Sequence, residues 1–529
     1  MNYFVFVCGE LAEETFPKSI GINVLSRHSF ILRGYTQKYL LSGKAVLMEN
    51  PASQTAGSII EISGDDLWIL DQWEEMPLTD REFISLETDA GTVSAFMYVC
   101  KTDRFLCDNH DMLRNSVDEF LLRQSRYPDQ RCDLHLLVPC SIMDERKLFR
   151  LAGACPRSNF ASLLIDKVNT ANADEFKDPF VKSMHRICLG RFYFSYHYSG
   201  AEAEEKNIVQ PCIVTCSVHA ETQLAVLNIS MPAVSASMHQ VMAYFCYQQF
   251  QIFDGKTSTD FVSWMHTCGI EAHGTARSIV FSSKPMTKAD LLNALASEAE
   301  PMGEIVSDEL IQASQTNIAQ YNTAQVFVSE NVLIEIFNVY RENIFDRLDY
   351  QCIELFFLEL ILLQNAAISR LCDRVQSRIE FEKNNPHVKQ GDLDDLVAEA
   401  SQAIRFWDVD QFYYPTVRMS AKKIAELFGM QRQIDKYHTS IELLEKLVSI
   451  HEAKVEATES KVLNCLVLLL TIVQVLPSFF DIVRSLLEHS ITLDDIIAFL
   501  YSCGISAFIL AVFAIIRKMI LQKRLRKHR

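Results

Sequence analysis

The chain has 529 residues, with 50 Lys and Arg against 67 Asp and Glu, so its formal charge is −17 at pH 7. This acidic balance argues against nucleic acid polymers as partners, because binding to a phosphate backbone needs a basic surface. Fifteen cysteines are scattered along the chain without a C-x-x-C pair, which favours free thiols in a reducing compartment over a disulfide framework. The length leaves room for about three soluble domains.

Residues 1–125 are predicted to form a compact, strand-rich α+β domain. Met112–Arg123 has the pattern of a closing helix, and the first residues carry neither the charged leader nor the cleavage site of a signal peptide. Apolar runs separated by Gly, Pro, Asn and Asp predict five strands, at Phe4–Val7, Ala45–Met48, Ser58–Ile62, Phe83–Leu86 and Val93–Val99.

Three stretches of this domain resemble the γ-glutamylcyclotransferase-like (AIG2-like) family. Phe4–Leu11 stands where the family has a strand and a Tyr-Gly-Ser-Leu loop, and Ala56–Ile62 and Leu70–Glu74 match later pieces of the family pattern. The resemblance implies a small β-barrel-like fold. It also implies an enzyme that cyclises a γ-glutamyl group to 5-oxoproline and releases the amine.

The resemblance places the family's catalytic glutamate at Glu74 and its substrate cradle at Cys8, Gly9, Glu10 and Leu11. Such a reaction needs a carboxylate that moves a proton from the substrate's α-amine to the leaving nitrogen, and loop amides that hold the substrate. Cys8 and Glu10 replace the tyrosine and the serine of the family's loop, and Glu10 adds negative charge where an anionic substrate would lie. The alternative is a binding or regulatory domain with a relict pocket.

Residues 130–302 are predicted to form an α/β domain. Met238–Phe253 and Lys288–Ala296 fit helices, and Thr287 is placed to cap the second of them. Strands are predicted at Leu134–Val138, Ile187–Tyr196, Ile213–Val218 and Gln223–Ile229. Cys212, Cys216 and His219 could supply a zinc site, but buried free thiols are the ordinary interpretation of such a run.

Residues 303–461 are predicted to form a stalk domain that is nearly continuous helix. Ile353–Leu363 is very apolar but includes Glu354 and Glu359, which favours a buried helix of the soluble part over a membrane span.

Two further features mark the stalk domain. Asp392, Asp394 and Asp395 precede a helix, where carboxylates favour the positive helix end, or else they form a divalent-cation site. Met430–Phe480 has no glycine, and its only proline is Pro477. One helix is therefore predicted to run from the cytosol into the membrane, with an apolar face that forms an oligomer seam or packs against helices of the same subunit.

Two apolar runs near the end, Val462–Phe480 and Ile496–Ile516, are each long enough to cross a bilayer core of roughly 30 Å. They predict a transmembrane hairpin over residues 462–516. Basic residues concentrate in the tail, 517–529, whereas the connecting loop has only Arg484. Because positive charge stays on the cytoplasmic side, both termini are expected in the cytoplasm, with the chain multi-pass in the cell (inner) membrane and the tail facing anionic lipid.

The first apolar run contains a polar stripe. At about 100° per residue, Asn464, Thr471, Gln474 and Ser478 lie within roughly a third of the helix circumference. Polar groups in hydrocarbon need a partner or water, so this face is expected to point inward. The stripe predicts either a pore lining contributed by several subunits or hydrogen bonds between the helices of an anchor.

From about 130 to 529, the order of these parts resembles the CorA-type divalent cation channels. The resemblance implies a pentamer whose first membrane helix lines a pore, with Mg²⁺ as the candidate ion; no other cofactor is indicated. The family's Gly-Met-Asn signature is absent, and Leu476–Asp481 stands in its place. Asp481 is the carboxylate nearest that pore mouth, where it either attracts cations or serves as an interfacial residue.

Together these patterns predict a multidomain α+β membrane protein with three alternatives for its function. The first is a CorA-like oligomeric channel, transporter or ligand-gated effector, controlled by its cytoplasmic domains. The second is a membrane-anchored cyclotransferase-like or lyase-like enzyme. The third is an antiviral effector that responds to a nucleotide signal, as some CorA-like proteins do, although neither GxGxxG nor GxxxxGK[ST] occurs in the chain.

Overall fold

A computed structural model describes most of the chain, and the contacts between its residues divide it into two units. The first unit is Met1–Gln376 with Gly391–Ser440, and the second is Ser377–Gln390 with Ile441–Arg529. The described residues are 2–88, 91–108, 111–126, 131–155, 159–175, 183–198, 206–234, 238–297, 307–320, 322–337, 344–384, 415–487 and short pieces between 493 and 512.

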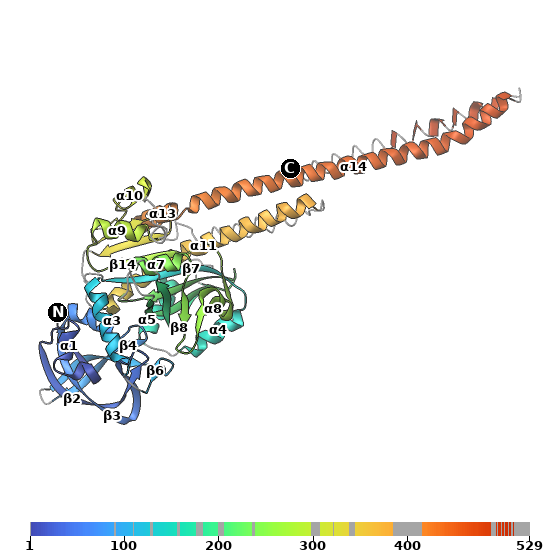
Figure 1. The fold of residues 1–529 in the computed structure, drawn as a ribbon. Coiled ribbons are helices and arrows are strands. Elements are labelled where there is room, and N and C mark those ends of the chain that lie inside the picture. Colours follow the sequence, from blue (N-terminus) through green and yellow to red (C-terminus); the bar gives the residue numbers. More distant parts are fainter. Residues whose placement is uncertain are drawn as a thin grey trace. The chain divides into compact units, whose positions relative to one another are not determined.

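The first strands form a six-stranded sheet in the order β4-β5-β1-β3-β2-β6. Figure 1 draws this part of the chain in blue. β1 is antiparallel to β3 and parallel to β5, and β3 also pairs with β5 at Leu47 and Val99. Because these three strands all pair with one another, the sheet is strongly curled. Its strands are β1 Asn2–Val7, β2 Ser26–Leu40, β3 Ala45–Ser63, β4 Thr79–Thr88, β5 Gly91–Cys100 and β6 Leu106–Cys107.

The five strands predicted in this region are confirmed, two of them as parts of the single long strand β3. The closing helix is α3, Leu113–Arg126. Between β3 and β4 lies α2, Gly64–Trp73, which begins with a capping box. The Ser63 hydroxyl accepts from the backbone N–H of Asp66, and the Asp66 carboxylate accepts from the backbone N–H of Ser63. This cap fixes where α2 starts and therefore where it ends, beside Glu74.

The second sheet has ten strands in the described residues. They run in the order β12-β11-β8-β9-β10-β7-β14-β16-β15, and β13 pairs with β7. Only the β14–β16 pair is parallel among the pairings described. The strands are β7 Cys132–Ile142, β8 Met184–Tyr198, β9 Lys206–His219, β10 Leu224–Met231, β11 Gln251–Phe253, β12 Ser258–Asp260, β13 Ile270–Ala272, β14 Arg277–Ser282, β15 Ala324–Val328 and β16 Val332–Phe337.

Both faces of the second sheet are covered, as β10 shows. All eight of its residues are buried. Leu224 and Val226 join one apolar cluster, whereas Ala225 and Leu227 join the other, because successive side chains point to opposite faces. The first cluster includes residues of α11, Ile344–Asn384. The second includes residues of α7 Met238–Cys246, α8 Phe261–Cys268 and α9 Lys288–Leu295.

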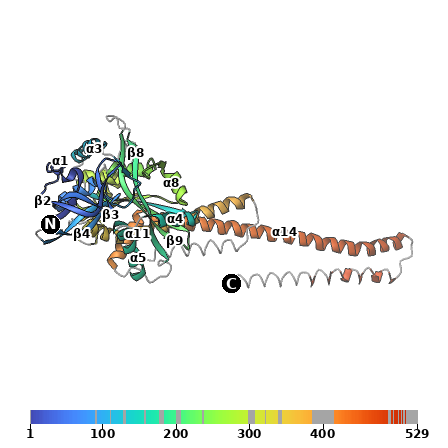
Figure 2. The same ribbon diagram turned by 90° about the horizontal axis from the view of Figure 1, so that it is seen from below.

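The predicted buried helix at 353–363 lies inside α11. In the described residues, Leu348–Glu380 is the one helix that is long and apolar enough to cross a membrane, but 82% of its apolar window is buried inside the protein. The Glu359 carboxylate is tolerated inside the protein because the Arg186 guanidinium lies 2.6 Å from it, and both side chains are fully buried. The part of α11 from Leu348 to Cys372 thus belongs to the apolar core of the first unit. Figure 2 labels this helix in a second view.

Two helical predictions are wrong in part. Within 303–461, predicted as nearly continuous helix, residues 324–337 form the strands β15 and β16. Their β-branched and aromatic residues favour strands, and β16 pairs with β14 on one side and with β15 on the other. Helix 238–253 ends early, since α7 stops at Cys246 and β11 then pairs with β8. Gln248 marks the break with a φ of +54°, which no helix accommodates. The predicted helix at 288–296 is confirmed as α9, with Thr287 accepting from the N–H of Asp290.

The second unit contains most of α14, a single helix of 58 residues over Met430–Leu487 that includes Pro477. The prediction of one uninterrupted helix is therefore confirmed. Large apolar side chains in its 462–480 part are exposed, among them Leu468 at 62%, Leu469 at 59% and Ile472 at 48%. In the second apolar run, Ile496–Ile505 is a shorter apolar helix. The basic tail, 517–529, and Asp392, Asp394 and Asp395 lie outside the described residues.

Candidate functional site

The loop after β1 brings the predicted cradle next to the end of α2. A short 3₁₀ helix, η1 Gly9–Ala12, follows the strand directly. Gly9 has a φ of +57°, and a Cβ at this position would lie 2.3 Å from Cβ of Ala45, so only glycine fits the turn. The Leu11 side chain is buried in the apolar core, so only its backbone can contribute to a cradle.

Glu10 and Glu74 are both buried in this cluster, at 7% and 5% exposure. The Glu10 carboxylate accepts from the backbone N–H of Ala45 at 3.1 Å, and burial raises its pKa. Burial, and then repulsion from Glu10, raise the pKa of Glu74 well above its ordinary value. Burial and the same two carboxylates also raise the pKa of Cys8. The predicted residues therefore lie together, with Glu74 favoured in its protonated form.

Glu75, in contrast to Glu74, is favoured in its ionised form. Its carboxylate lies 2.9 Å from the Lys44 ammonium and accepts from the Tyr193 hydroxyl at 2.6 Å. Burial alone would raise its pKa, but Lys44 and Tyr193 outweigh that effect, so the pKa lies below its ordinary value. Lys44 also lies 4.5 Å above the Trp73 ring. Two adjacent carboxyl groups thus take opposite protonation states, an arrangement that suits acid/base chemistry.

Lys44 and Tyr193 are site residues that the sequence analysis missed. Lys44 follows the turn between β2 and β3, and Tyr193 comes from β8 of the second sheet. Neither residue carries a local signal, because each is brought to Glu75 only by long-range strand pairing.

The predicted pore residues all lie on α14. Asn464 is exposed on this helix. Thr471, Gln474, Ser478 and Asp481 are helical, but their side chains lie outside the described residues. The stripe therefore stays a prediction.

The zinc alternative has a plain structural account. Cys212 and Cys216 point into the apolar core, while His219 hydrogen-bonds to Ser183 at 2.8 Å and to Thr222 at 2.9 Å. Among the residues that the structure describes, no group of three or more His, Cys, Asp or Glu could hold a metal ion.

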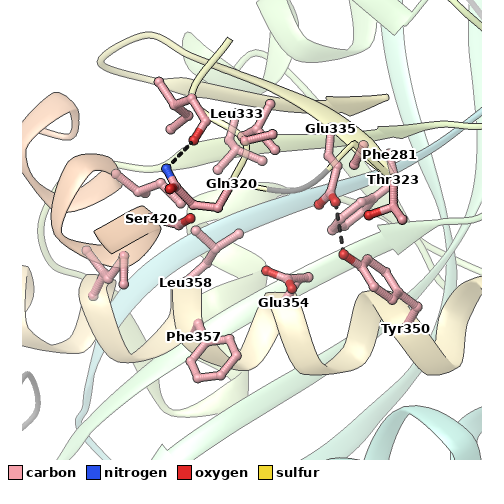
Figure 3. Close-up of a pocket in the computed structure, with 17 residues that line it drawn as sticks. Phe281, Gln320, Thr323, Leu333, Glu335, Tyr350, Glu354, Phe357, Leu358 and Ser420 are labelled. Atoms are coloured by element: carbon pink, nitrogen blue, oxygen red, sulfur yellow. Dashed lines mark hydrogen bonds between the residues drawn. The ribbon is translucent and has the colours of Figure 1, made fainter. Parts of the chain in front are cut away.

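A second candidate site is a cavity of about 120 Å³ in the first unit, which the sequence did not reveal (Figure 3). Glu335 of β16 and Glu354 of α11 both line it, and the Tyr350 hydroxyl donates to Glu335 at 3.1 Å. Burial, and then the nearby Glu354, raise the pKa of Glu335 to about 8, and burial raises that of Glu354 to about 7. The available signal was a lone glutamate within each apolar run, VLIEIF and IELFFL.

No family model matches the chain, and no curated protein matches it. Among solved structures, it is similar to YkqA from Bacillus subtilis, with 13% identity over 59% of this chain and 96% of that one. The TM-score of 0.16 is too low to support an argument about fold or function.

Proposed function

We propose that this chain is an oligomeric membrane protein of CorA-like architecture, in which the soluble first unit controls a cation pore built from the C-terminal helices. The observation that carries this proposal is α14. It begins in the first unit at Met430 and continues without a break through the apolar run 462–480.

The length and surface of α14 support a membrane role. At ~1.5 Å per residue, Val462–Phe480 is about 28 Å long, close to the roughly 30 Å of a bilayer core. Leu466, Leu468 and Phe480 expose 55–62% of their surface in the described chain. Contiguous apolar surface of this kind is unfavourable in water, so lipid or further copies of the chain must cover it.

The polar stripe supports an oligomer arranged around an axis. Asn464, Thr471, Gln474 and Ser478 recur on one side of a helix whose other sides are apolar. If several copies turned this side toward a common axis, the stripes would line a pore, and Asp481 would draw cations to its mouth. The basic tail sets both termini on the cytoplasmic side. The ion is left as a cation, because the Gly-Met-Asn signature associated with magnesium is absent.

The test of this proposal uses the full chain, purified in detergent and reconstituted into liposomes loaded with a cation-sensitive dye. We expect a ring-sized oligomer by light scattering and cation entry into the liposomes. Asn464→Leu should reduce the flux several-fold, because it removes a polar group from the pore wall. The neighbouring substitution Cys465→Leu, about 100° around the helix, is the matched control and should leave flux unchanged. A monomer or dimer without flux contradicts the proposal.

A second candidate function is favoured by the Glu10–Glu74 cluster. We propose that the N-terminal domain, which is similar to γ-glutamylcyclotransferase-like proteins, cyclises γ-glutamyl amines. The α-amine of the substrate attacks its own γ-carbonyl carbon, and the amide C–N bond breaks. Glu74 takes a proton from the attacking amine and delivers it to the leaving nitrogen. The step starts from the ionised fraction of Glu74, and the raised pKa, caused by burial and by Glu10, makes this carboxylate a stronger base.

Glu74→Gln should lower the rate of amine release from γ-glutamyl amines by at least about 100-fold, because it removes the group that carries the proton. The measurement is 5-oxoproline formation by mass spectrometry over a panel of γ-glutamyl amides. Glu14→Gln, a change of the same chemistry at an exposed position, serves as the control. If the unchanged chain turns over none of the panel, or if Glu74→Gln keeps full activity, the enzymatic proposal is wrong.

A further inference from the structure

The cavity beside α11 is lined by several elements of the first unit. Phe281 of β14 and Leu333 of β16 lie on the sheet side, and Phe357 and Leu358 lie on α11. Ser420 and its neighbours come from α13, Pro415–Leu427. At about 120 Å³, the cavity approaches the roughly 150 Å³ that accommodates a benzene ring. It is therefore large enough for a small organic molecule rather than a single water.

The two carboxyl groups of this cavity favour a positively charged occupant, and Gln320, Thr323 and Ser420 add neutral polar groups to its lining. Figure 3 shows Glu335 and Glu354 directed toward the same space, with Tyr350 bonded to Glu335. Glu335, Glu354 and Tyr350 are the titratable groups among the described lining residues, which include no Lys, Arg or His. Two carboxyl groups without a facing cation are costly to ionise in such a place, so they retain protons until a cation replaces them.

The apolar walls decide between a metal ion and an organic cation. A hard divalent cation takes six or more oxygen ligands and favours clustered carboxylates, but this cavity has only two carboxyl groups among its described lining residues. No group of three or more His, Cys, Asp or Glu in the described part of the chain could hold a metal ion. An ammonium group has three N–H donors, which match carboxylate oxygens, and an attached hydrocarbon body matches the walls.

We propose that this cavity is a binding site for a small organic cation, a protonated primary amine on an apolar body, held between Glu335 and Glu354.

The position of the cavity beside α13 allows an occupant to affect the start of the long helix α14. Ile424 of α13 lines the cavity, and α13 is followed after Phe428 and Gly429 by α14. The Arg277 guanidinium donates to the carbonyl oxygen of Phe428 at 3.2 Å and lies over its ring, which ties this connection to β14. An occupant that repacks α13 therefore acts at the start of α14. This coupling rests on the proposed membrane function, whereas the binding itself does not.

The experiment measures benzylamine binding to the full chain in detergent by calorimetry at pH 7.5, with benzyl alcohol and benzoate as neutral and anionic probes. We expect benzylamine to bind at least ten-fold more tightly than either. Its binding enthalpy should vary with the ionisation enthalpy of the buffer, because the carboxyl pair releases protons. Glu335→Gln and Glu354→Gln should each weaken benzylamine binding at least ten-fold. Glu309→Gln, at an exposed position of α10, Asp308–Ala313, should not.

A further variant, Ser420→Phe, tests the site even if a glutamine variant folds poorly. Ser420→Phe fills the cavity from a partly exposed position and retains both carboxyl groups, so it should block benzylamine binding while the chain stays folded. Equal binding of benzylamine and benzyl alcohol, or unchanged binding in these three variants, overturns the site. If benzylamine binds but leaves liposome flux unaltered in a chain that does conduct, the coupling to α14 is overturned and the site stands.

Discussion

At the scale of single residues, the buried carboxyl groups of the first unit are stabilised in two ways. A cation lies against the carboxyl groups of Glu359 and Glu75, Arg186 at 2.6 Å and Lys44 at 2.9 Å, and Lys44 helps to hold the pKa of Glu75 below its ordinary value. No ion pair of this kind is described for Glu74 or Glu335, and their pKa values, raised first by burial, favour the protonated form. The groups kept protonated lie in the two candidate sites, where a proton is available for transfer or for exchange with a ligand.

The state of Glu335 predicts how stability depends on pH. Its pKa rises on folding from an ordinary 4.5 to about 8, so the folded protein holds a proton that the unfolded chain loses between these values. The contribution of this proton to the free energy of unfolding is therefore complete below pH 4.5 and is lost as the pH rises to about 8. The Glu335→Gln variant has no titrating group at this position, so it does not lose stability in this way as the pH rises. Its free energy of unfolding, relative to that of the unchanged chain, should increase by about 1–3 kcal/mol from pH 5 to pH 8.

Urea unfolding of both proteins across this pH range provides the measurement. The exposed substitution Glu309→Gln should show a pH-independent difference. A constant difference between Glu335→Gln and the unchanged chain would mean that Glu335 is ionised in the folded state throughout.

At the scale of secondary structure, the sequence predicted a helix with a clear period correctly, but it did not identify the strand β16, which is buried on both faces. A 3.6-residue period and a missing helix breaker were enough for α14, which is one helix as predicted. A run such as VLIEIF, by contrast, is apolar at nearly every position, and periodicity does not separate a doubly buried strand from a buried helix. Residues 332–337 become strand β16 because β14 and β15 pair with them on either side.

At the scale of the whole first unit, buried polar contacts join the two sheets. The Asp80 carboxylate on β4 lies 2.6 Å from the Arg191 guanidinium on β8, and both side chains are buried. The Tyr193 hydroxyl, two residues further along β8, donates to Glu75. The Gln72 amide donates to the carbonyl oxygen of Val234 at 3.0 Å. The N-terminal domain is thus bonded to the second sheet through groups adjacent to Glu74.

This joint predicts that the two sheets lose stability together. Arg191→Ala leaves the Asp80 carboxylate buried without this partner, which should cost about 3–5 kcal/mol in urea unfolding. Hydrogen exchange should accelerate in both β4 and β8. Lys423→Ala, which removes an exposed pair with Glu426, is the control and should cost less than about 1 kcal/mol. Faster exchange in β8 alone would show that the N-terminal domain is stable independently of the second sheet.

Local patterns in the sequence were sufficient for features that depend on neighbouring residues. They determined parts of β1, β3, β4 and β5 in the N-terminal domain but missed β2 and β6. They also determined the Thr287 cap, the buried character of 353–363 and the continuity of α14. The resemblance to the γ-glutamylcyclotransferase-like family, rather than a local pattern, pointed to Cys8, Glu10 and Glu74, which the structure brings together.

Only the tertiary structure decided the rest, because it depends on residues that are far apart in the chain. Tyr193 reaches Glu75 across 118 positions, and Lys44 reaches it across the sheet, so the state of the candidate active site could not be read locally. The cavity between β16, α11 and α13 likewise exists only once these elements pack. The sequence by itself therefore singled out candidate groups such as Glu74, whereas tertiary packing decided which buried carboxyl groups have a cation beside them and which line a cavity.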